Sequence, residues 1–357
     1  MKKILSVIGA RPQFIKAGPL SQEMRKYFKE VLVHTGQHYD YGMSDIFFTE
    51  LSIPEPDYNL GVGAVSQGKM TGDMLSKLED VILAEKPDIV LIYGDTNSTL
   101  AGALAAVKLH IPIAHVEAGL RSYNRSMPEE INRVLSDQVS TWLFVPSKVA
   151  KNNLEKEGIK EGVYEVGDIM FDVLLANSKK ATDTSDVLKT NGLSSKNYFV
   201  ATIHRAENTD EKDKLVRIFD IFALLNEKII LPIHPRTRNK IVSFGLTVPK
   251  NISAIEPLGY LDMLELMQNA KAIFTDSGGI QKEAYYLKVP CITLREESEW
   301  IETVEVGWNF IVGSDKVKFT NVFQQLDKVK SKEHPFLYGD GTTAEKIVNI
   351  LREHFKL

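Results

Sequence analysis

Acidic side chains follow predicted strands in the first half of the chain, in positions from which carboxylates can exchange protons with a substrate. Asp95 and Glu117 each come just after a short apolar run, and Glu129 follows Pro128 at the start of a predicted helix. Capping and the helix dipole explain each residue taken alone. Carboxylates that converge at one end of a sheet repel one another, however, and this cost favours a functional interpretation. We therefore treat Asp95, Glu117 and Glu129 as candidates for acid–base chemistry.

Two histidines occupy equivalent places in the second half of the chain. His204 and His234 each lie just past a predicted strand, and an arginine follows each of them, Arg205 directly and Arg236 after one proline. A single histidine in such a place is usually a hydrogen-bonded structural residue. A matched pair beside cations is equally consistent with a catalytic or binding role.

A glycine-containing turn predicts a phosphate site. The run Ser277-Gly278-Gly279 joins a predicted strand to a helix, which leaves backbone N–H groups free to face an anion at the helix N-terminus. Glu283 lies one turn further and could accept hydrogen bonds from ribose hydroxyls. Arg11 and Lys16, after the first strand, could place two cations near a phosphate, although surface charges at a helix start are the simpler explanation of these two alone.

The elements that must hold these residues alternate between strand and helix along the whole chain. Such alternation predicts parallel sheets covered on both faces, with ligands bound where the carboxyl ends of the strands meet. We therefore predict an α/β fold of two Rossmann-like, doubly wound domains facing a cleft. The expected strands are 4–8, 31–35, 89–93, 111–116, 142–145, 198–203, 228–233, 252–255, 272–275 and 291–294.

Two further segments complete this plan. The segment 178–195 is rich in Ser, Thr, Asp and Lys and only weakly periodic, and we interpret it as a surface connection; 343–355 predicts a helix with one apolar face. The loop after the first strand has neither the Walker A spacing nor the G-x-G-x-x-G of a dinucleotide site. Two α/β domains, a diphosphate turn and no nicotinamide fingerprint indicate a nucleotide-sugar enzyme.

Composition excludes several other classes of protein. The 357 residues include 43 Lys and Arg against 47 Asp and Glu, which argues against a nucleic-acid partner held by bulk positive charge. With 43% hydrophobic and 25% charged residues, the composition is that of a soluble globular protein. A single cysteine, Cys291, excludes a disulfide framework and a cysteine-rich metal site. The first apolar run ends at Arg11, too early for a signal segment, so we expect a cytoplasmic protein with no membrane partner.

In combination, these motifs resemble the non-hydrolysing UDP-N-acetylglucosamine 2-epimerase family along essentially the whole chain. The resemblance implies the GT-B architecture, with domains at 1–168 and 169–342 and the C-terminal helix 343–357 returning to the first domain. It also implies an isomerase that interconverts UDP-GlcNAc and UDP-ManNAc for surface polysaccharide precursors. In that mechanism the C2 proton is removed and UDP is expelled to give 2-acetamidoglucal, and UDP then adds back with protonation from the other face. The matching segments are 9–16, 94–99, 115–121, 128–133, 204–205, 234, 276–283 and 338–341.

The resemblance also implies a role for each candidate residue. Asp95, Glu117 and Glu129 become the acid–base carboxylates, with the C2 base not assigned to any one of them, and His204 assists the departure and return of UDP. Arg133 supports the carboxylates. The family requires no metal or other cofactor, and its members suggest a homodimer. The residues expected to bind the UDP-sugar are Arg11, Lys16, Arg133, His234, Leu258, Met263, Ser277, Gly278, Gly279 and Glu283.

Some positions depart from the family's pattern. Gln13 stands where the first loop usually has Glu, and Trp300 stands where many UDP-GlcNAc members have Arg. Both variants are similar to a branch that acts on UDP-2,3-diacetamido-2,3-dideoxyglucuronate, whose carboxylate would need a cation such as Arg205, Arg236 or Arg295. A GT-B glycosyltransferase, which would require an acceptor, is the alternative from another class. The segment 39–43 also matches poorly the one through which many bacterial members bind a second UDP-GlcNAc as an activator.

Overall fold

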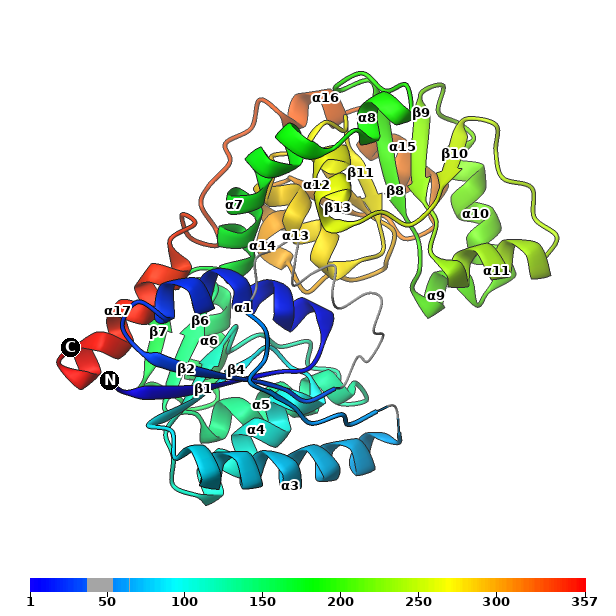
Figure 1. Cartoon of the computed structure of the whole chain (residues 1–357). Coiled ribbons are helices and arrows are strands. Elements are labelled where there is room, and N and C mark those ends of the chain that lie inside the picture. The colour runs from blue at the N-terminus through cyan, green and yellow to red at the C-terminus, as the bar shows by residue number, and fades with distance from the viewer. Residues whose placement is uncertain (37–53, 64) are drawn as a thin grey trace. The chain divides into compact units, whose positions relative to one another are not determined.

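The computed structural model describes residues 1–36, 54–63 and 65–357, and these form two compact units. The first unit comprises Met1–Leu175 and Phe336–Leu357, and the second comprises Ala176–Pro335. Each unit is a parallel sheet with helices packed on both of its faces (Figure 1). The predicted α/β fold with two Rossmann-like units is therefore confirmed.

The sheet of the first unit has the strand order β3-β2-β1-β4-β5-β6-β7, and every neighbouring pair is parallel. The order reverses between β1 and β4, and doubly wound sheets bind ligands at the carboxyl ends of strands beside such a reversal. The strands are β1 (Lys3–Ile8), β2 (Lys29–His34), β3 (Tyr58–Asn59), β4 (Ile89–Tyr93), β5 (Ile113–Val116), β6 (Trp142–Val145) and β7 (Val163–Glu165). The helices are α1 (Arg11–Met24), α3 (Gln67–Glu85), α4 (Asn97–Lys108), α5 (Pro128–Val139), α6 (Lys148–Lys156) and α17 (Thr343–Phe355).

The sheet of the second unit repeats this plan with the order β10-β9-β8-β11-β12-β13, again parallel throughout. Here the reversal lies between β8 and β11. The strands are β8 (Tyr198–Thr202), β9 (Lys228–Pro232), β10 (Ile252–Ile255), β11 (Ile273–Thr275), β12 (Cys291–Thr293) and β13 (Asn309–Ile311). The helices are α7 (Ile169–Thr184), which begins in the first unit, and α8 (Val187–Thr190), α9 (Ala206–Thr209), α10 (Lys212–Phe222), α11 (Pro235–Ser243), α12 (Tyr260–Gln268), α13 (Gly278–Tyr286), α14 (Ile301–Glu305), α15 (Lys316–Phe323) and α16 (Leu326–Val329).

The central strands supply the cores of both units. All five residues of β4 and all five of β8 are buried, as expected of parallel strands covered on both faces. In the first unit the core is made mostly of aliphatic side chains from β1, β4, α3 and α4. In the second unit Phe199 and Phe274 stack at 5.0 Å between ring centroids inside a largely aromatic and aliphatic cluster. These rigid sheets fix the carboxyl-end loops that carry the candidate residues.

The bounds of the units differ from the predicted domain bounds of 168 and 343. Hydrogen bonds tie the start of α7 and the segment 336–342 to the first unit. The backbone N–H of Asp168 donates to the carbonyl oxygen of Tyr338 at 2.9 Å, and the Asp172 carboxylate accepts from the backbone N–H of Ala344 at 2.8 Å. The first unit therefore includes residues up to 175 and from 336 onward.

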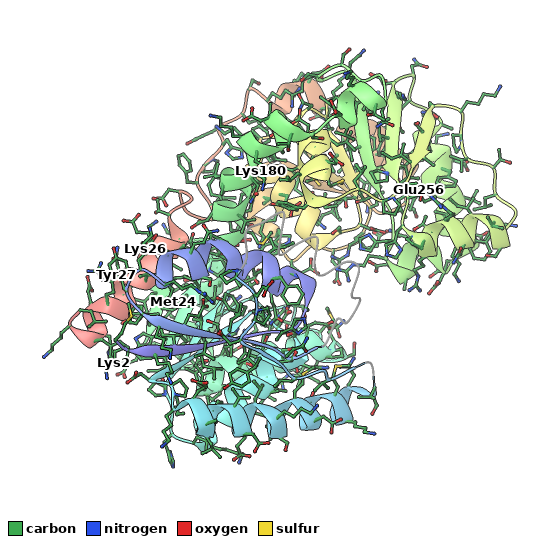
Figure 2. The ribbon with its side chains drawn as sticks, in the orientation of Figure 1. Lys2, Met24, Lys26, Tyr27, Lys180 and Glu256 are labelled. Carbon is green, nitrogen blue, oxygen red and sulfur yellow. The ribbon has the colours of Figure 1, made fainter. Side chains whose placement is uncertain are left out.

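The C-terminal helix α17 packs against the first unit, beside α1. The Arg352 guanidinium lies 3.9 Å from the ring centroid of Tyr27, and the Lys2 ammonium lies 5.1 Å from that of Phe355. Figure 2 labels Lys2 and Tyr27 on this side of the unit, together with Met24, which is fully buried. The C-terminal helix α17 therefore belongs to the same unit as the N-terminal strand β1.

Candidate active site

Asp95 lies at the reversal of the first sheet, where it forms an ion pair with Arg133 of α5. The other guanidinium nitrogen of Arg133 lies 3.1 Å from the carboxylate of Glu130. The side chain that caps α4 is Thr96, which accepts from the backbone N–H of Thr99. The capping explanation of Asp95 is therefore wrong, and its carboxylate is available for another role.

Glu117 follows β5 and forms an ion pair with Lys16 of α1. Only 10% of each side chain is exposed, so the pair is largely desolvated. The backbone of Glu117 has a φ of 68°, a left-handed conformation that costs a residue other than glycine about 1–3 kcal/mol. Strain of this kind persists where the surrounding structure holds a side chain in a required direction. Lys16, a predicted diphosphate ligand, is thus in contact with Glu117, a predicted catalytic carboxylate.

The two glutamates at the start of α5 have different surroundings. Glu129 is exposed, and its carboxylate makes no hydrogen bond or ion pair with any other residue that the structure describes. Glu130 is buried and accepts from the backbone N–H groups of Ser122 and Tyr123, both at 2.9 Å. Burial raises the pKa of Glu130, but these hydrogen bonds and Arg133 outweigh it, and the net pKa is lowered. Glu130 thus anchors the preceding loop, and Glu129 stays open to solvent.

A buried charged network that sequence analysis did not assign lies beneath these carboxylates. His115 is fully buried in β5; its Nδ1 lies 2.8 Å from Asp137 and its Nε2 lies 2.7 Å from the carbonyl oxygen of Gly94. Asp137 of α5 also accepts from Arg121 at 2.7 Å, and Arg121 pairs with Glu157 at 2.7 Å. Burial raises the pKa of Asp137, but His115 and Arg121 lower it by more. The network joins the turn before Asp95 to β5 and α5.

Gln13, noted as a departure from the family's pattern, connects three parts of the first unit. Its side-chain oxygen accepts from the backbone N–H groups of Gly9 and Ala10, at 2.8 and 3.0 Å. Its side-chain nitrogen donates to the carbonyl oxygen of Tyr93 at 2.8 Å and to the hydroxyl of Thr99 at 3.0 Å. An amide can accept on one side and donate on the other, which a carboxylate cannot do. Gln13 therefore fixes the loop after β1 to the end of β4.

In the second unit, His204 lies beside the buried carboxylate of Asp276. Its Nδ1 is 3.2 Å from Asp276 Oδ1, and its backbone N–H donates to the same carboxylate at 3.0 Å. Asp276 also accepts from the backbone N–H of Arg205 at 3.0 Å and from the Asn208 amide at 3.1 Å. Burial lowers the pKa of His204, and Arg205 and His234 lower it further, whereas Asp276 raises it; the net pKa is lowered.

The turn that predicts a phosphate site is formed as expected, with Ser277 as the residue before α13 and Gly278 and Gly279 in its first turn. The neighbouring strand end carries His204, because Thr275 of β11 pairs in register with Thr202 of β8. His234 follows β9 on the other side of β8, and the two histidine rings are 5.7 Å apart between centroids. The structure therefore gathers His234, His204 and the Ser277 turn at consecutive strand ends.

Trp300 contacts this turn directly. Its indole N–H donates to the carbonyl oxygen of Gly278 at 2.8 Å, and the ammonium of Lys282 lies 4.2 Å from the centroid of its ring. Lys282 is buried, so the cation–π contact stabilises a charge that is removed from water. Arg295 pairs with Glu299 at 2.9 Å, next to Trp300 in the sequence. Trp300, which differs from the family's usual Arg, thus packs directly against the predicted diphosphate turn.

The remaining predicted binding residues of the second unit also lie at the carboxyl ends of its strands. Leu258 and Met263 are half-buried and pack against the hydrophobic core, and Glu283 is half-buried on α13. Burial raises the pKa of Tyr260 well above its ordinary value, and the negative charge of Glu283 adds to this effect. Arg11 begins α1 in the first unit. The segment 39–43 lies outside the described residues.

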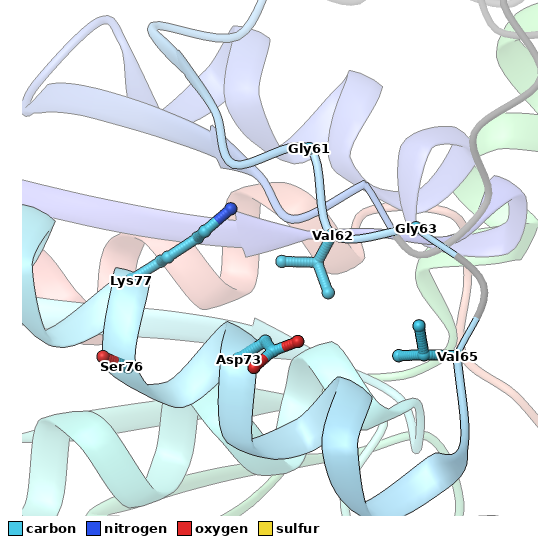
Figure 3. A pocket seen from close by; sticks show the side chains of 7 residues that line it. All are labelled: Gly61, Val62, Gly63, Val65, Asp73, Ser76 and Lys77. Atoms are coloured by element: carbon cyan, nitrogen blue, oxygen red, sulfur yellow. The ribbon is translucent and has the colours of Figure 1, made fainter.

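None of these residues lines a groove of about 240 Å³ in the first unit. It lies between residues 61–63 and helix α3, and Figure 3 shows the side chains that line it, among them Val62, Asp73 and Lys77. In residues 1–36, 54–63 and 65–357, no three His, Cys, Asp or Glu side chains gather closely enough to bind a metal ion. No helix in that same part of the chain has the length and apolar character that crossing a membrane requires.

Comparison with known proteins identifies the family. The family model described as UDP-N-acetylglucosamine 2-epimerase matches residues 21–352. The chain belongs to the UDP-N-acetylglucosamine 2-epimerase family. It is 52% identical over 356 residues to a UDP-N-acetylglucosamine 2-epimerase homolog of Methanococcus maripaludis, with 98% of this chain and 99% of the relative covered. It is 47% identical over 360 residues to the UDP-2,3-diacetamido-2,3-dideoxy-D-glucuronate 2-epimerase of Pseudomonas aeruginosa, with 98% and 99% covered.

A solved structure of the family supports the same assignment. The UDP-GlcNAc 2-epimerase of Methanocaldococcus jannaschii, crystallised with UDP-GlcNAc and UDP, is 45% identical to this chain. It superimposes with a TM-score of 0.87 over 99% of this chain and 100% of the other. The predicted family and the predicted isomerase class are confirmed. The epimerase family thus accounts for the whole length of the chain.

Proposed function

We propose that this epimerase interconverts UDP-GlcNAc and UDP-ManNAc without hydrolysis. The observation that carries the proposal is the combination of carboxylates beyond the strand ends of one unit with a glycine-containing turn at a helix start in the other, within a chain of this family. Relatives that share 46% and 47% of its residues are named UDP-N-acetylglucosamine 2-epimerase. Such an enzyme supplies precursors for surface polysaccharides, acts in the cytoplasm and works as a homodimer.

Residues of the first unit carry out the chemistry on the sugar. A carboxylate among Asp95, Glu117 and Glu129 removes the C2 proton, the C–H electron pair forms the C1–C2 double bond, and the C1–O bond to UDP breaks. The product is 2-acetamidoglucal, to which UDP adds back while a carboxylic acid protonates C2 from the other face. Lys16 and Arg133 form ion pairs with Glu117 and Asp95 and so hold these two carboxylates in place.

Residues of the second unit, together with Arg11 and Lys16 of the first, bind the departing diphosphate. The backbone N–H groups of Gly278 and Gly279 at the start of α13 and the hydroxyl of Ser277 stabilise its negative charge, as helix N-termini do for anions, while the backbone N–H of Ser277 donates to the Thr275 hydroxyl at 2.9 Å. His234 and Arg11 add donors, and Lys16 can contribute as well because an ammonium carries three of them. Glu283 binds the ribose, Leu258 and Met263 flank the uracil, and His204 assists the departure and return of UDP.

A second candidate substrate is UDP-2,3-diacetamido-2,3-dideoxyglucuronate, which the same chemistry would epimerise. The Pseudomonas aeruginosa relative supports it, as do Gln13 and Trp300. Of the three arginines considered for the uronate carboxylate, Arg236 pairs with Asp210 at 2.6 Å and Arg295 with Glu299 at 2.9 Å. Arg205 forms no ion pair with any residue in the described ranges and is the best candidate for that cation.

Proton NMR of the protein with UDP-GlcNAc in D2O tests this proposal. We expect the UDP-ManNAc signal to grow and deuterium to enter at C2 of both epimers. Release of free ManNAc and UDP would indicate a hydrolysing enzyme instead. A requirement for an acceptor, with no exchange at C2, would indicate a glycosyltransferase. Exchange with the diacetamido-uronate alone would assign that substrate, and light scattering coupled to size exclusion would test the homodimer.

A further inference from the structure

His234 presents a hydrogen-bond donor from its neutral form. Its Nδ1 accepts the backbone N–H of Arg236 at 3.1 Å, so this nitrogen carries a lone pair and no proton. A neutral imidazole has one N–H, and here it must be on Nε2. His234 can therefore donate to a phosphate oxygen without taking up a proton.

His204 has the opposite arrangement. Its Nδ1 faces Asp276 Oδ1 at 3.2 Å, and Asp276 is fully buried among groups that donate to it. Those donors are the backbone N–H groups of His204 and Arg205 and the side-chain amide of Asn208. The oxygens of this carboxylate accept those N–H groups, and a lone pair on Nδ1 would be repelled by the lone pairs of Oδ1. The neutral ring of His204 therefore carries its proton on Nδ1 and a lone pair on Nε2.

The charged groups that face His204 make it responsive to an anion. Arg205 and His234 disfavour the imidazolium and Asp276 favours it, while burial disfavours it most, so that the net pKa of His204 is lowered. The ring is then mainly neutral in the ligand-free protein at neutral pH. A lone pair on Nε2 would repel a phosphate oxygen. A diphosphate that binds beside this ring must either avoid Nε2 or bring a proton onto it.

His204 lies where such a diphosphate would bind. Thr202 and Thr275 are paired in register on adjacent strands, so His204 and Ser277 occupy equivalent positions, two residues beyond those strand ends. The link is also covalent, because Asp276 precedes Ser277 in the chain. The group that faces the Nδ1 of His204 is therefore part of the same turn as the anion-binding N–H groups.

We propose that binding of a diphosphate draws a proton from solvent onto Nε2 of His204, with Asp276 as the positioning residue that sets the tautomer and stabilises the imidazolium. His234 binds the same diphosphate as a neutral donor. The proposal rests on the proposed function only in placing a diphosphate at the Ser277 turn. When UDP leaves the sugar, His204 is then already an N–H donor to the charge that develops on it.

Calorimetric titration with UDP at pH 8 tests the proton uptake, since the terminal phosphate is then itself ionised. The binding enthalpy in buffers of different ionisation enthalpy gives the number of protons taken up. We expect uptake approaching about one proton per UDP in the wild type and almost none in His204→Gln. In Asp276→Asn the amide N–H₂ can face Nδ1, which moves the ring proton to Nε2, so uptake should fall by at least about half. The control is Asp210→Asn, an exposed carboxylate near the same strand ends, which should match the wild type.

A second measurement decides the tautomers without any ligand. Long-range ¹H–¹⁵N correlation spectra of the wild-type protein should show His204 protonated on Nδ1 and His234 protonated on Nε2, with the signals assigned from His204→Gln and His234→Gln. The reverse tautomer at His204, or equal proton uptake in the wild type and His204→Gln, would overturn the inference. Failure of UDP to bind the wild type, with the expected tautomers present, would instead contradict the proposed function.

Discussion

The three proposed acid–base carboxylates have three different environments, although their side chains are chemically alike. Glu117 is nearly buried against Lys16, Asp95 is one-third exposed against Arg133, and Glu129 is exposed to solvent. The three carboxylates therefore differ in their charged partners and in their contact with water.

We expect Asp95→Asn, Glu117→Gln and Glu129→Gln each to lower kcat by at least about 10²-fold, because each amide can neither accept nor donate the transferred proton. The measurement is the initial rate of UDP-ManNAc formation together with deuterium incorporation at C2. Glu155→Gln, an exposed glutamate of α6, is the matched control and should retain wild-type rates. Full activity in any one of the three variants would remove that residue from the chemistry.

Sequence patterns could predict which polar residues stand at strand ends but not the buried residues that hold them in place. Asp95, Glu117 and His204 stand at strand ends, which short apolar runs reveal. Asp137 and Asp276 are buried, and each is recognisable only once distant strands have brought its donors together, as β8 and β11 do for Asp276. The same limit applies to Glu129 and Glu130 at the start of α5, because no local sequence pattern indicates which of the two carboxylates is buried.

At the scale of elements, the pair of His115 and Asp137 joins β5 to α5 and to the turn after β4. We expect Asp137→Asn to lower the free energy of unfolding at pH 7 by about 3 kcal/mol, because it removes the buried carboxylate that pairs with Arg121 and hydrogen-bonds His115. The measurement is urea unfolding of the variant and the wild type. Asp183→Asn, at an exposed position on α7, should change the stability by less than about 0.5 kcal/mol.

The pH dependence of this effect has a definite sign. The folded-state pKa of Asp137 lies below its ordinary value of 3.8, so its contribution is fully present above about pH 4. The contribution is lost as the pH falls through the folded-state pKa. The stability difference between the wild type and Asp137→Asn should therefore shrink below about pH 4, and a difference that grew with acidity would contradict this assignment.

Helices and strands were predictable wherever burial imposes a strong pattern. The predicted strands of both halves correspond to β1, β2, β4, β5, β6 and to β8–β12, because two-sided burial produces continuous apolar runs.

The interpretation of 178–195 as a surface connection is wrong in part, since α7 extends to Thr184 and α8 follows it. Most side chains there are exposed, but Ala181 is fully buried and Thr182 hydrogen-bonds Glu265 at 3.0 Å. Tertiary contacts therefore support a helix that its own periodicity hardly indicates.

At the scale of the whole molecule, the chain passes between its two units at residues 175–176 and 335–336. Apolar patterning predicted the helix 343–355, and the family resemblance implied that it returns to the first unit, but neither indicated how far that unit extends along the chain. The hydrogen bond between Asp168 and Tyr338 joins residues far apart in sequence, and no local pattern indicates it. The last residues of the second unit are held by aromatic contacts, with the rings of His334 and Tyr285 stacked at 4.1 Å.

The proposed function assigns roles on one substrate to Asp95 and Glu117 of the first unit and to His204 and the Ser277 turn of the second. A ligand that binds both limits their relative motion, so we expect UDP to lower the radius of gyration measured by small-angle X-ray scattering. Uridine, which lacks the diphosphate, is the matched control and should leave the profile closer to that of the free protein. Identical profiles with and without UDP, at concentrations that calorimetry shows to be saturating, would place the whole UDP site within one unit. The sugar would then have to reach the carboxylates without any closure of one unit upon the other.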